Sequence, residues 1–382
     1  MPDGYNLLEI DLRFILRVTT TLRDSITQAV VAVCCVSGLW AAAPPEHPYA
    51  GAQACAQCHE AKFLQQSQTG HANSLHRAAE HPLAPSFITS EPLRREPGYE
   101  FIFFRTSEGP RVRAAGKDDV MEMNLDWAFG AGEQGVTFVT RGNAQWYLEH
   151  AFSYFTGPGS FAHTPGHEGP ADSLPKAVGI LYEIADAGSG ILQCFDCHST
   201  GPVALGAGRV IHPLEPGVQC ESCHGPGRLH IEAMRSGNLK RGLDLIRNLG
   251  RLSAVELVEQ CGACHRSTEL GAPVDWEDPW NTRHAPVYLV QSRCFQRSAG
   301  RLSCLTCHDP HGELRRSEPA YYAEKCSRCH EGVRHPNEGF AKTEAADCSG
   351  CHMPKVQPHP HLKFTNHWVG VFRADKPLRP VR

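Results

Sequence analysis

The alternation of hydrophobic and polar positions is clearest between residues 99 and 155. Residues 99–105, 111–115, 135–141 and 145–155 are runs rich in aromatic and β-branched side chains, and glycine-containing turns separate them. An apolar side chain at every second position is typical of a strand with one buried face, and short glycine turns join such strands into hairpins. The pattern therefore predicts a small β-rich insert.

Helix signals lie elsewhere, just ahead of paired cysteines. Ser253 with Glu256 three residues later has the form of a capping box, which predicts a helix running towards Cys261. Pro319 likewise precedes a helical stretch that leads into Cys326. Because the chain has 35 Gly and 28 Pro in 382 residues and only 8% aromatic residues, we expect turns and short helices in the remainder. The fold class that these signals favour is mainly α with extensive loops.

The first 43 residues have the organisation of a signal peptide. A region with three arginines precedes an apolar stretch at residues 26–40, and three alanines at residues 41–43 supply a cleavage signal. We therefore expect export from the cytoplasm and removal of residues 1–43, with Cys34 and Cys35; an uncleaved membrane anchor is the alternative. No other segment is long and apolar enough to cross a bilayer, so the mature chain is expected to have no membrane span.

The charge balance disfavours one class of partner. Lys and Arg number 37 and Asp and Glu 41, which gives a formal net charge of -4 at pH 7. A nucleic-acid surface needs a basic stripe with interleaved aromatic residues, and the sequence has none. We expect no nucleic-acid partner.

Cysteine spacing carries the strongest chemical signal. Fourteen of the 17 cysteines fall into seven copies of the pattern Cys-x-x-Cys-His. Two thiols at this spacing can bond the two vinyl groups of one porphyrin, and the imidazole that follows then lies under the iron as its proximal ligand. The pattern predicts seven haem c groups. The motifs are Cys55/Cys58/His59, Cys194/Cys197/His198, Cys220/Cys223/His224, Cys261/Cys264/His265, Cys304/Cys307/His308, Cys326/Cys329/His330 and Cys348/Cys351/His352.

Zinc is the alternative cofactor, because paired cysteines also build zinc ribbons and knuckles. A zinc site needs no histidine directly after the second cysteine, yet all seven pairs have one. A redox-active disulfide motif is disfavoured because it is not expected to recur seven times in one chain. Without residues 1–43 the chain has about 48 residues for each haem, too few for separate domains, so the haems are expected to stack and form much of the core.

Histidine is expected to fill the second axial position of the irons. Fifteen histidines lie outside the motifs, whereas the chain has only four methionines besides the initiator. Every motif is followed by at least one such histidine before the next motif begins. The distal candidates are His71, His212, His230, His284, His311, His335 and His367.

His311 is expected to ligate a neighbouring haem rather than the haem of its own motif. It follows His308 by three residues, which span at most about 11 Å, too little to pass comfortably round the porphyrin rim to the opposite face. The same reasoning applies to His230, six residues after His224. Such cross-ligation would hold adjacent haems close together, as electron hopping requires.

The motif spacing divides the chain into four regions. These are a signal peptide at residues 1–43, an N-terminal module with one haem at 44–96, a haem-free β-rich insert at 97–172 and a hexahaem cytochrome region at 173–382. In the mature chain Cys294 alone lies outside the motifs. We expect it to be buried beside a haem as a small apolar residue, and a reactive thiol is the alternative.

Residues around the motifs resemble a known family. Residues 55–59 lead on to Gly70-His71-Ala72, residues 220–227 lead on to His230, and similar stretches follow at 291–295, 302–311, 348–355 and 365–368. In these stretches the chain resembles the multihaem cytochromes of the cytochrome c-554 and hydroxylamine-oxidoreductase superfamily. The resemblance implies a mostly helical, haem-stacked fold, electron transfer and an oxidising location outside the cytoplasm. The chain departs from it in having seven motifs, more than the tetrahaem members carry.

Two functions are compatible with the sequence. The first is electron transfer between redox partners in the periplasm or outside the cell, from a quinol-oxidising complex or soluble cytochrome to a terminal reductase or an extracellular acceptor. The alternative is a haem-dependent oxidoreductase acting on a small nitrogen or sulfur compound at one five-coordinate haem. Side chains of the insert that could assist such a reaction are His150, His163, His167, Tyr147 and Tyr154.

Overall fold

The computed structural model describes residues 47–143, 145–185, 189–266, 274–332 and 347–381. The chain divides into a unit of residues 1–46 and a unit of residues 47–382, and the fold described below belongs to the second unit. The expected signal peptide lies outside the described residues.

The mainly α fold class is wrong. Helices of all kinds take up 33% of the described residues and strands 25%, and the strands form several sheets. The strands are β1 (Leu75–Arg77), β2 (Leu93–Arg95), β3 (Tyr99–Thr106), β4 (Gly109–Ala115), β5 (Val120–Asn124), β6 (Trp127–Phe129), β7 (Gly135–Arg141), β8 (Trp146–His150), β9 (Phe152–Phe155), β10 (Ser160–His163), β11 (Gly179–Glu183), β12 (Ser199–Leu205), β13 (Ile211–Pro216), β14 (Lys355–His359) and β15 (Leu362–Thr365).

The helices are short, as the glycine and proline content predicts. The α-helices are α1 (Ala52–Gln66), α2 (Leu174–Val178), α3 (Gly190–His198), α4 (Cys220–His224), α5 (Arg228–Arg235), α6 (Leu239–Asp244), α7 (Ala254–His265), α8 (Ala285–Leu289), α9 (Arg293–Arg297), α10 (Cys304–Cys307), α11 (Pro319–Ser327) and α12 (Cys348–His352). Single 3-10 turns are η1 (Ala84–Ser86), η2 (Ala207–Arg209), η3 (Leu249–Arg251) and η4 (Pro279–Arg283).

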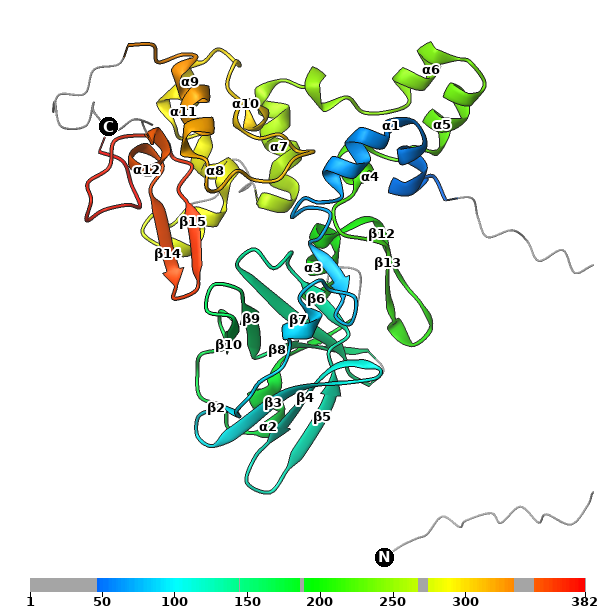
Figure 1. Cartoon of the computed structure of the whole chain (residues 1–382), viewed down its shortest axis with the longest axis vertical. Helices are drawn as coiled ribbons and strands as arrows, with labels where there is room; N and C mark the ends of the chain where they lie inside the picture. Colours follow the sequence, from blue (N-terminus) through cyan, green and yellow to red (C-terminus); the bar gives the residue numbers. More distant parts are fainter. Residues whose placement is uncertain (1–46, 144, 186–188, 267–273, 333–346, 382) are drawn as a thin grey trace, which may run out of the picture. The chain divides into compact units, whose positions relative to one another are not determined.

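Two antiparallel sheets make up most of the β structure. The larger has seven strands: its main path runs β1-β6-β7-β8-β11, β9 pairs with β7, and β10 pairs with β9. The smaller has the order β2-β3-β4-β5, and Figure 1 shows its strands side by side. The runs at 99–105, 111–115 and 135–141 are strands as predicted, and the run at 145–155 forms two, because Ala151 separates β8 from β9.

Aromatic side chains fill the space between these sheets. On β3, Phe101 and Phe103 are buried while Glu100 and Ile102 are exposed, as the strand period of two requires. The ring of Phe103 stacks on Phe161 with centroids 4.0 Å apart, and Phe138 of β7 is fully buried in the same cluster. This part of the molecule therefore has an ordinary side-chain core. The expectation that haem replaces side chains in the interior does not hold here.

The capping box predicted at Ser253 is present and opens α7. The Ser253 hydroxyl accepts a hydrogen bond from the Glu256 backbone N–H, and the Glu256 carboxylate accepts one from the Ser253 N–H at 2.7 Å. These bonds satisfy two amide donors that a helix leaves unpaired at its start. The prediction at Pro319 is also confirmed, since α11 begins at that residue and contains Cys326.

Candidate haem-attachment sites

Each of the seven motifs lies in or at the end of a short helix. The helices that carry them, in chain order, are α1, α3, α4, α7, α10, α11 and α12. Residues i, i+3 and i+4 of a helix share one face, so a single turn can present both thiols and the imidazole on the same side. Helices α10 and α11 end before the histidine of their motif, so His308 and His330 lie in the segments that follow these helices.

Several motif residues are exposed on the polypeptide surface. In the first and last motifs, Cys58, His59 and Cys351 are all exposed. His59 also departs from helical geometry, with φ -117° and ψ 39°. The exposed motif residues elsewhere are Cys194, Cys264, His265, Cys329 and His330.

The buried apolar side chains lie mainly in the β region. The two clusters of buried hydrophobic residues consist mainly of strand residues of the β region, and α1 and α12 contribute none to them. An exposed thiol remains accessible to a haem-attaching enzyme. Cys58, His59 and Cys351 therefore stay predicted haem ligands on their motif spacing alone, without support from burial.

The fifteen cysteines in the described part of the chain form no disulfide. Thiols of different motifs approach one another in four pairs, each within hydrogen-bonding reach. The pairs are Cys55 with Cys220, Cys197 with Cys264, Cys261 with Cys304, and Cys326 with Cys348. The hydrogen bond from Cys264 lowers the pKa of Cys197 to about 7, and that from Cys304 does the same for Cys261. Motifs distant in sequence are therefore neighbours in space.

Three motif imidazoles have a second imidazole close by, from another part of the chain. The ring centroids of His224 and His311 are 6.0 Å apart, those of His265 and His71 5.9 Å, and those of His308 and His367 6.3 Å. A metal–imidazole bond is about 2 Å long, so two imidazoles on opposite faces of one metal ion have centroids roughly 6 Å apart. The three spacings match that requirement.

Backbone carbonyls orient several of these rings. Nδ1 lies within hydrogen-bonding distance of a carbonyl oxygen in five histidines, which leaves Nε2 available to a metal. These contacts are His198 to Ser74 at 3.0 Å, His224 to Arg247 at 2.8 Å, His230 to Gly242 at 2.8 Å, His352 to Gly370 at 2.8 Å and His367 to Thr365 at 2.9 Å. A metal-bound histidine almost always donates its other ring N–H in this way. The donor set and its orientation therefore fit haem c.

Five of these imidazoles have a lowered pKa, which favours the neutral form that binds metals. Desolvation lowers the pKa of His71, His265 and His308, and the positive charge of a neighbouring histidine lowers each further. Burial also lowers the pKa of His367, to about 4, and that of His311.

The other distal candidates lie in different surroundings. His230 is on α5 with its ring held at Gly242, His212 is exposed on β13, and His284 accepts a hydrogen bond at Nε2 from Arg283 at 3.4 Å. His335 lies outside the described residues. Cys294 is half-buried, and this burial raises the pKa of its thiol.

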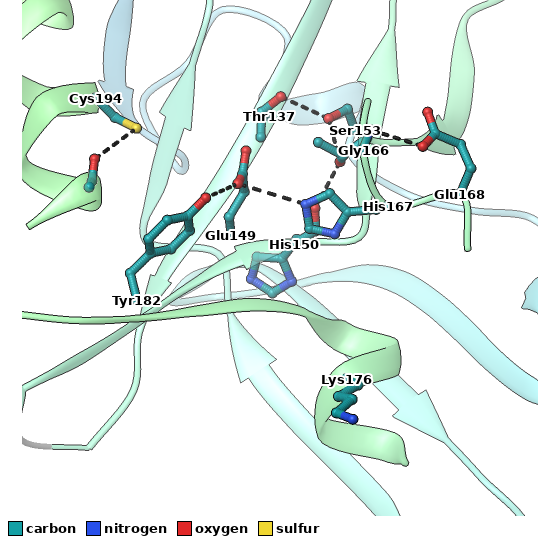
Figure 2. Close-up of polar contacts among 12 residues, drawn as sticks. Thr137, Glu149, His150, Ser153, Gly166, His167, Glu168, Lys176, Tyr182 and Cys194 are labelled. Atoms are coloured by element: carbon teal, nitrogen blue, oxygen red, sulfur yellow. Dashed lines mark hydrogen bonds and ion pairs between the residues drawn. The ribbon is translucent and has the colours of Figure 1, made fainter. Parts of the chain in front are cut away.

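Of the five side chains named as catalytic aids, the structure brings His150 and His167 together. His167 and Tyr182 both converge on Glu149 of β8, as Figure 2 shows, with His150 next along that strand. The other three make different contacts. Tyr147 accepts a hydrogen bond from the Ile211 N–H, His163 stacks on Phe152, and Tyr154 packs in the aromatic core. Sequence reasoning missed Glu149 and Tyr182, because a carboxylate or phenol within a strand has no local signature.

A second missed feature is a pair of carboxylates at the start of α1. Glu221, between the two cysteines of its motif, is 3% exposed and accepts hydrogen bonds from the N–H groups of Ala50 and Gly51, both at 2.8 Å, and of Gly227 at 2.6 Å. Glu215 accepts one from the Ala52 N–H at 3.1 Å. Only the folded structure reveals these contacts, since at least 163 residues separate the partners on α1 from either glutamate.

Two further observations concern the described residues alone. No group of three or more His, Cys, Asp and Glu side chains among them is arranged to hold a metal ion by itself. Within the same part of the chain, every helix is too short or too polar to cross a membrane.

Known proteins with similarity to the chain are cytochromes and a reductase. The profile of the family described as cytochrome c554 and c-prime matches residues 181–225, which include the motifs at Cys194 and Cys220. The dissimilatory sulfite reductase MccA of Wolinella succinogenes is 23% identical over 181 residues, which is 37% of this chain and 23% of that protein. The chain therefore spans less than a quarter of this relative's length.

Among solved structures, the outer cell wall cytochrome OcwA is similar, with a TM-score of 0.46 and 16% identity over 85% of this chain and 80% of that chain. By the family profile that it matches and its seven Cys-x-x-Cys-His motifs, the chain is similar to multihaem c-type cytochromes, a likeness that implies haem c, its iron and electron transfer.

Proposed function

We propose that the chain carries seven covalently attached haem c groups and transfers electrons between redox partners outside the cytoplasm. The observation that supports this most directly is the spacing of about 6 Å between motif imidazoles and imidazoles from distant segments. Haem supplies reversible one-electron chemistry at its iron when bound. The chain's own residues attach it and hold its axial ligands.

The ring pairs give the axial ligands of three haems. His71 is the distal partner of His265, His311 of His224 and His367 of His308. The pairing of His311 with a motif other than its own is the cross-ligation expected from its short distance to His308 in sequence. His230 presents Nε2 in the same manner, so we propose it as a further distal ligand. His212, His284 and His335 stay candidates for the irons that remain.

The thiol contacts support an electron path through the protein. Four contacts join different motifs. They are Cys197 with Cys264, Cys261 with Cys304, Cys55 with Cys220, and Cys326 with Cys348. The pair His224–His311 joins the third motif to the segment after the fifth. Haems attached at neighbouring motifs would be close enough for hopping from one to the next. A quinol-oxidising complex or soluble cytochrome would supply electrons, and a terminal reductase or extracellular acceptor would take them.

A second candidate is a haem-dependent oxidoreductase acting on a small nitrogen or sulfur compound. Two observations favour it. The first is that the matched relative is named a sulfite reductase. The second is that the ring centroid of His198 lies 5.3 Å from that of Phe129, which is a phenyl group and not an imidazole. The haem attached at Cys194 and Cys197 would be the five-coordinate one. A high-spin haem in the purified protein that binds nitrite or sulfite would favour the enzyme. Seven low-spin haems unresponsive to both would leave electron transfer.

Intact-mass measurement with a pyridine-haemochrome assay tests the haem count. We expect seven haem additions on the wild-type chain and six on a Cys261→Ala/Cys264→Ala double variant. A Cys294→Ser variant is the matched control, since it removes a thiol outside the motifs, and it should keep seven. Zinc without a haemochrome signal would overturn the proposed function.

A further inference from the structure

A half-buried carboxylate and a buried imidazole form a pair beside the helix that carries Cys194 and Cys197. Oε2 of Glu149, on β8, accepts a hydrogen bond from the Tyr182 hydroxyl at 2.9 Å and lies 3.7 Å from Nε2 of His167. Figure 2 shows His167 and Tyr182 reaching Glu149 from different segments. Three groups that can hold or donate protons therefore meet at one oxygen atom.

The imidazole of this pair lacks a hydrogen bond at one nitrogen. The His167 side chain is 2% exposed, and its Nε2 has no hydrogen-bond partner among the described residues, since 3.7 Å is beyond hydrogen-bonding range. A buried polar atom without a partner costs about 1–3 kcal/mol. Protonation would give His167 a positive charge 3.7 Å from a Glu149 carboxylate oxygen, which is within the range of an ion pair. One added proton would therefore give this nitrogen a favourable electrostatic partner.

The pair contacts the haem-attachment helix through Tyr182. The Tyr182 ring packs on Gly190, where an added Cβ would lie 3.4 Å from the ring. Gly190 is the first residue of α3, and its carbonyl oxygen accepts a hydrogen bond from the Cys194 thiol at 3.7 Å. Desolvation and then the charge of Glu149 raise the pKa of that thiol to about 11. Tyr182 therefore links Glu149 to the start of the helix that carries Cys194 and Cys197.

Other titratable groups face the pair from each neighbouring element. His150 of β8 and His163 of β10 both interact with His167. On the side of α3, Arg266 approaches Cys194 from the end of α7. Burial and the adjacent Glu149 charge raise the pKa of Tyr182, so its hydroxyl keeps its proton and continues to donate. His167 and Glu149 are the members of the group that can exchange a proton.

We propose that His167 and Glu149 form a proton-binding site coupled to the redox state of the haem attached at Cys194 and Cys197. The inference rests on the proposed function, because it needs a haem at that motif. Reduction adds one electron, taken from an external reductant or an electrode, and this negative charge favours a positive charge nearby. One proton from solvent then binds at His167 and is held by Glu149. Oxidation releases both the electron and the proton.

Proton uptake during reduction tests the proposal. The full-length protein is reduced in weakly buffered solution with a pH indicator, after its haem content has been measured. We expect the wild type to take up about one proton per chain more than His167→Gln or Glu149→Gln. In potentiometric titrations one component should move by about 59 mV per pH unit, the shift for one proton per electron, and both variants should lose this slope. Glu100→Gln, which neutralises an exposed carboxylate on β3, should behave as the wild type.

Separate outcomes overturn the inference and the function on which it rests. Equal proton uptake by wild type and both variants, at equal haem content, overturns the proton site alone. A chain without haem at this motif overturns the proposed function.

Where Glu149→Gln fails to fold, Tyr182→Phe is the second variant. It removes one hydroxyl that donates to Glu149, which leaves the carboxylate a stronger partner for a protonated imidazole. The pH range over which reduction is accompanied by uptake of the extra proton should therefore move to higher pH. An unchanged pH range contradicts the proposal.

Discussion

A single imidazole, His311, is the sharpest test of the proposed axial pairing. His311→Ala should convert one haem from low to high spin, because the ring 6.0 Å from His224 is lost. Attachment should persist, since Cys220 and Cys223 are unchanged. Electron paramagnetic resonance and the visible spectrum report the change, and added imidazole should reverse it. The nearby exposed Glu313→Gln is the control, and an unchanged spectrum in His311→Ala would remove His311 from the ligand set.

His150 makes the stability of the β structure depend on pH. Burial lowers its pKa to about 3, from 6.5 in the unfolded chain. Between these values the unfolded state binds a proton that the folded state does not, so stability falls as the pH drops below about 6.5. The loss at pH 4 should be roughly 3 kcal/mol. The protection of β7 and β8 amides against hydrogen exchange, relative to unstructured peptide at the same pH, should therefore fall at low pH in the wild type and less so in His150→Gln. An equal fall in both would contradict this assignment.

At the scale of elements, the start of α1 depends on carboxylates supplied by other segments. Helix α1 has Gly51 at its N-cap with no side-chain cap of its own, and Glu221 takes that role. Glu221→Ala should destabilise this region by roughly 3 kcal/mol, because three buried N–H groups lose a charged acceptor. Hydrogen exchange at Ala50, Gly51 and Gly227 measures the effect. The exposed Glu232→Gln on α5 should leave those amides unchanged, and slow exchange in Glu221→Ala would refute the capping role.

The elements that could be predicted are those whose signal is local. The capping box of α7 and the long alternating strands β3, β4 and β7 depend on residues close in sequence. The hairpins β12–β13 and β14–β15 were missed because proline interrupts their pattern, and β1 because it has only three residues. The candidate site divides in the same way. The motifs are visible in the sequence, whereas the ring pairs and the Glu149 group depend on long-range contacts.

At the scale of the whole molecule, the ligand inventory predicts low reduction potentials. Imidazole on both faces favours ferric haem relative to methionine ligation, which raises the potential. Two of the four available methionines, Met121 and Met123, pack against the aromatic core of the β region. Most haems should therefore titrate below the range of cytochromes with one methionine ligand. Spectroelectrochemical titration measures this, and strongly positive midpoints for most haems would contradict bis-histidine ligation.

The long-range capping of α1 also has a consequence for the order of folding during synthesis. Helix α1 leaves the ribosome well before Glu215 and Glu221, the two carboxylates that complete its first turn. Contacts of such high sequence separation form late, since chain entropy opposes them until most of the polypeptide is available. Helix α1 is thus synthesised early and acquires its last contacts late. Until Glu221 is in place, the first Cys-x-x-Cys-His motif would stay open to the enzymes that attach haem.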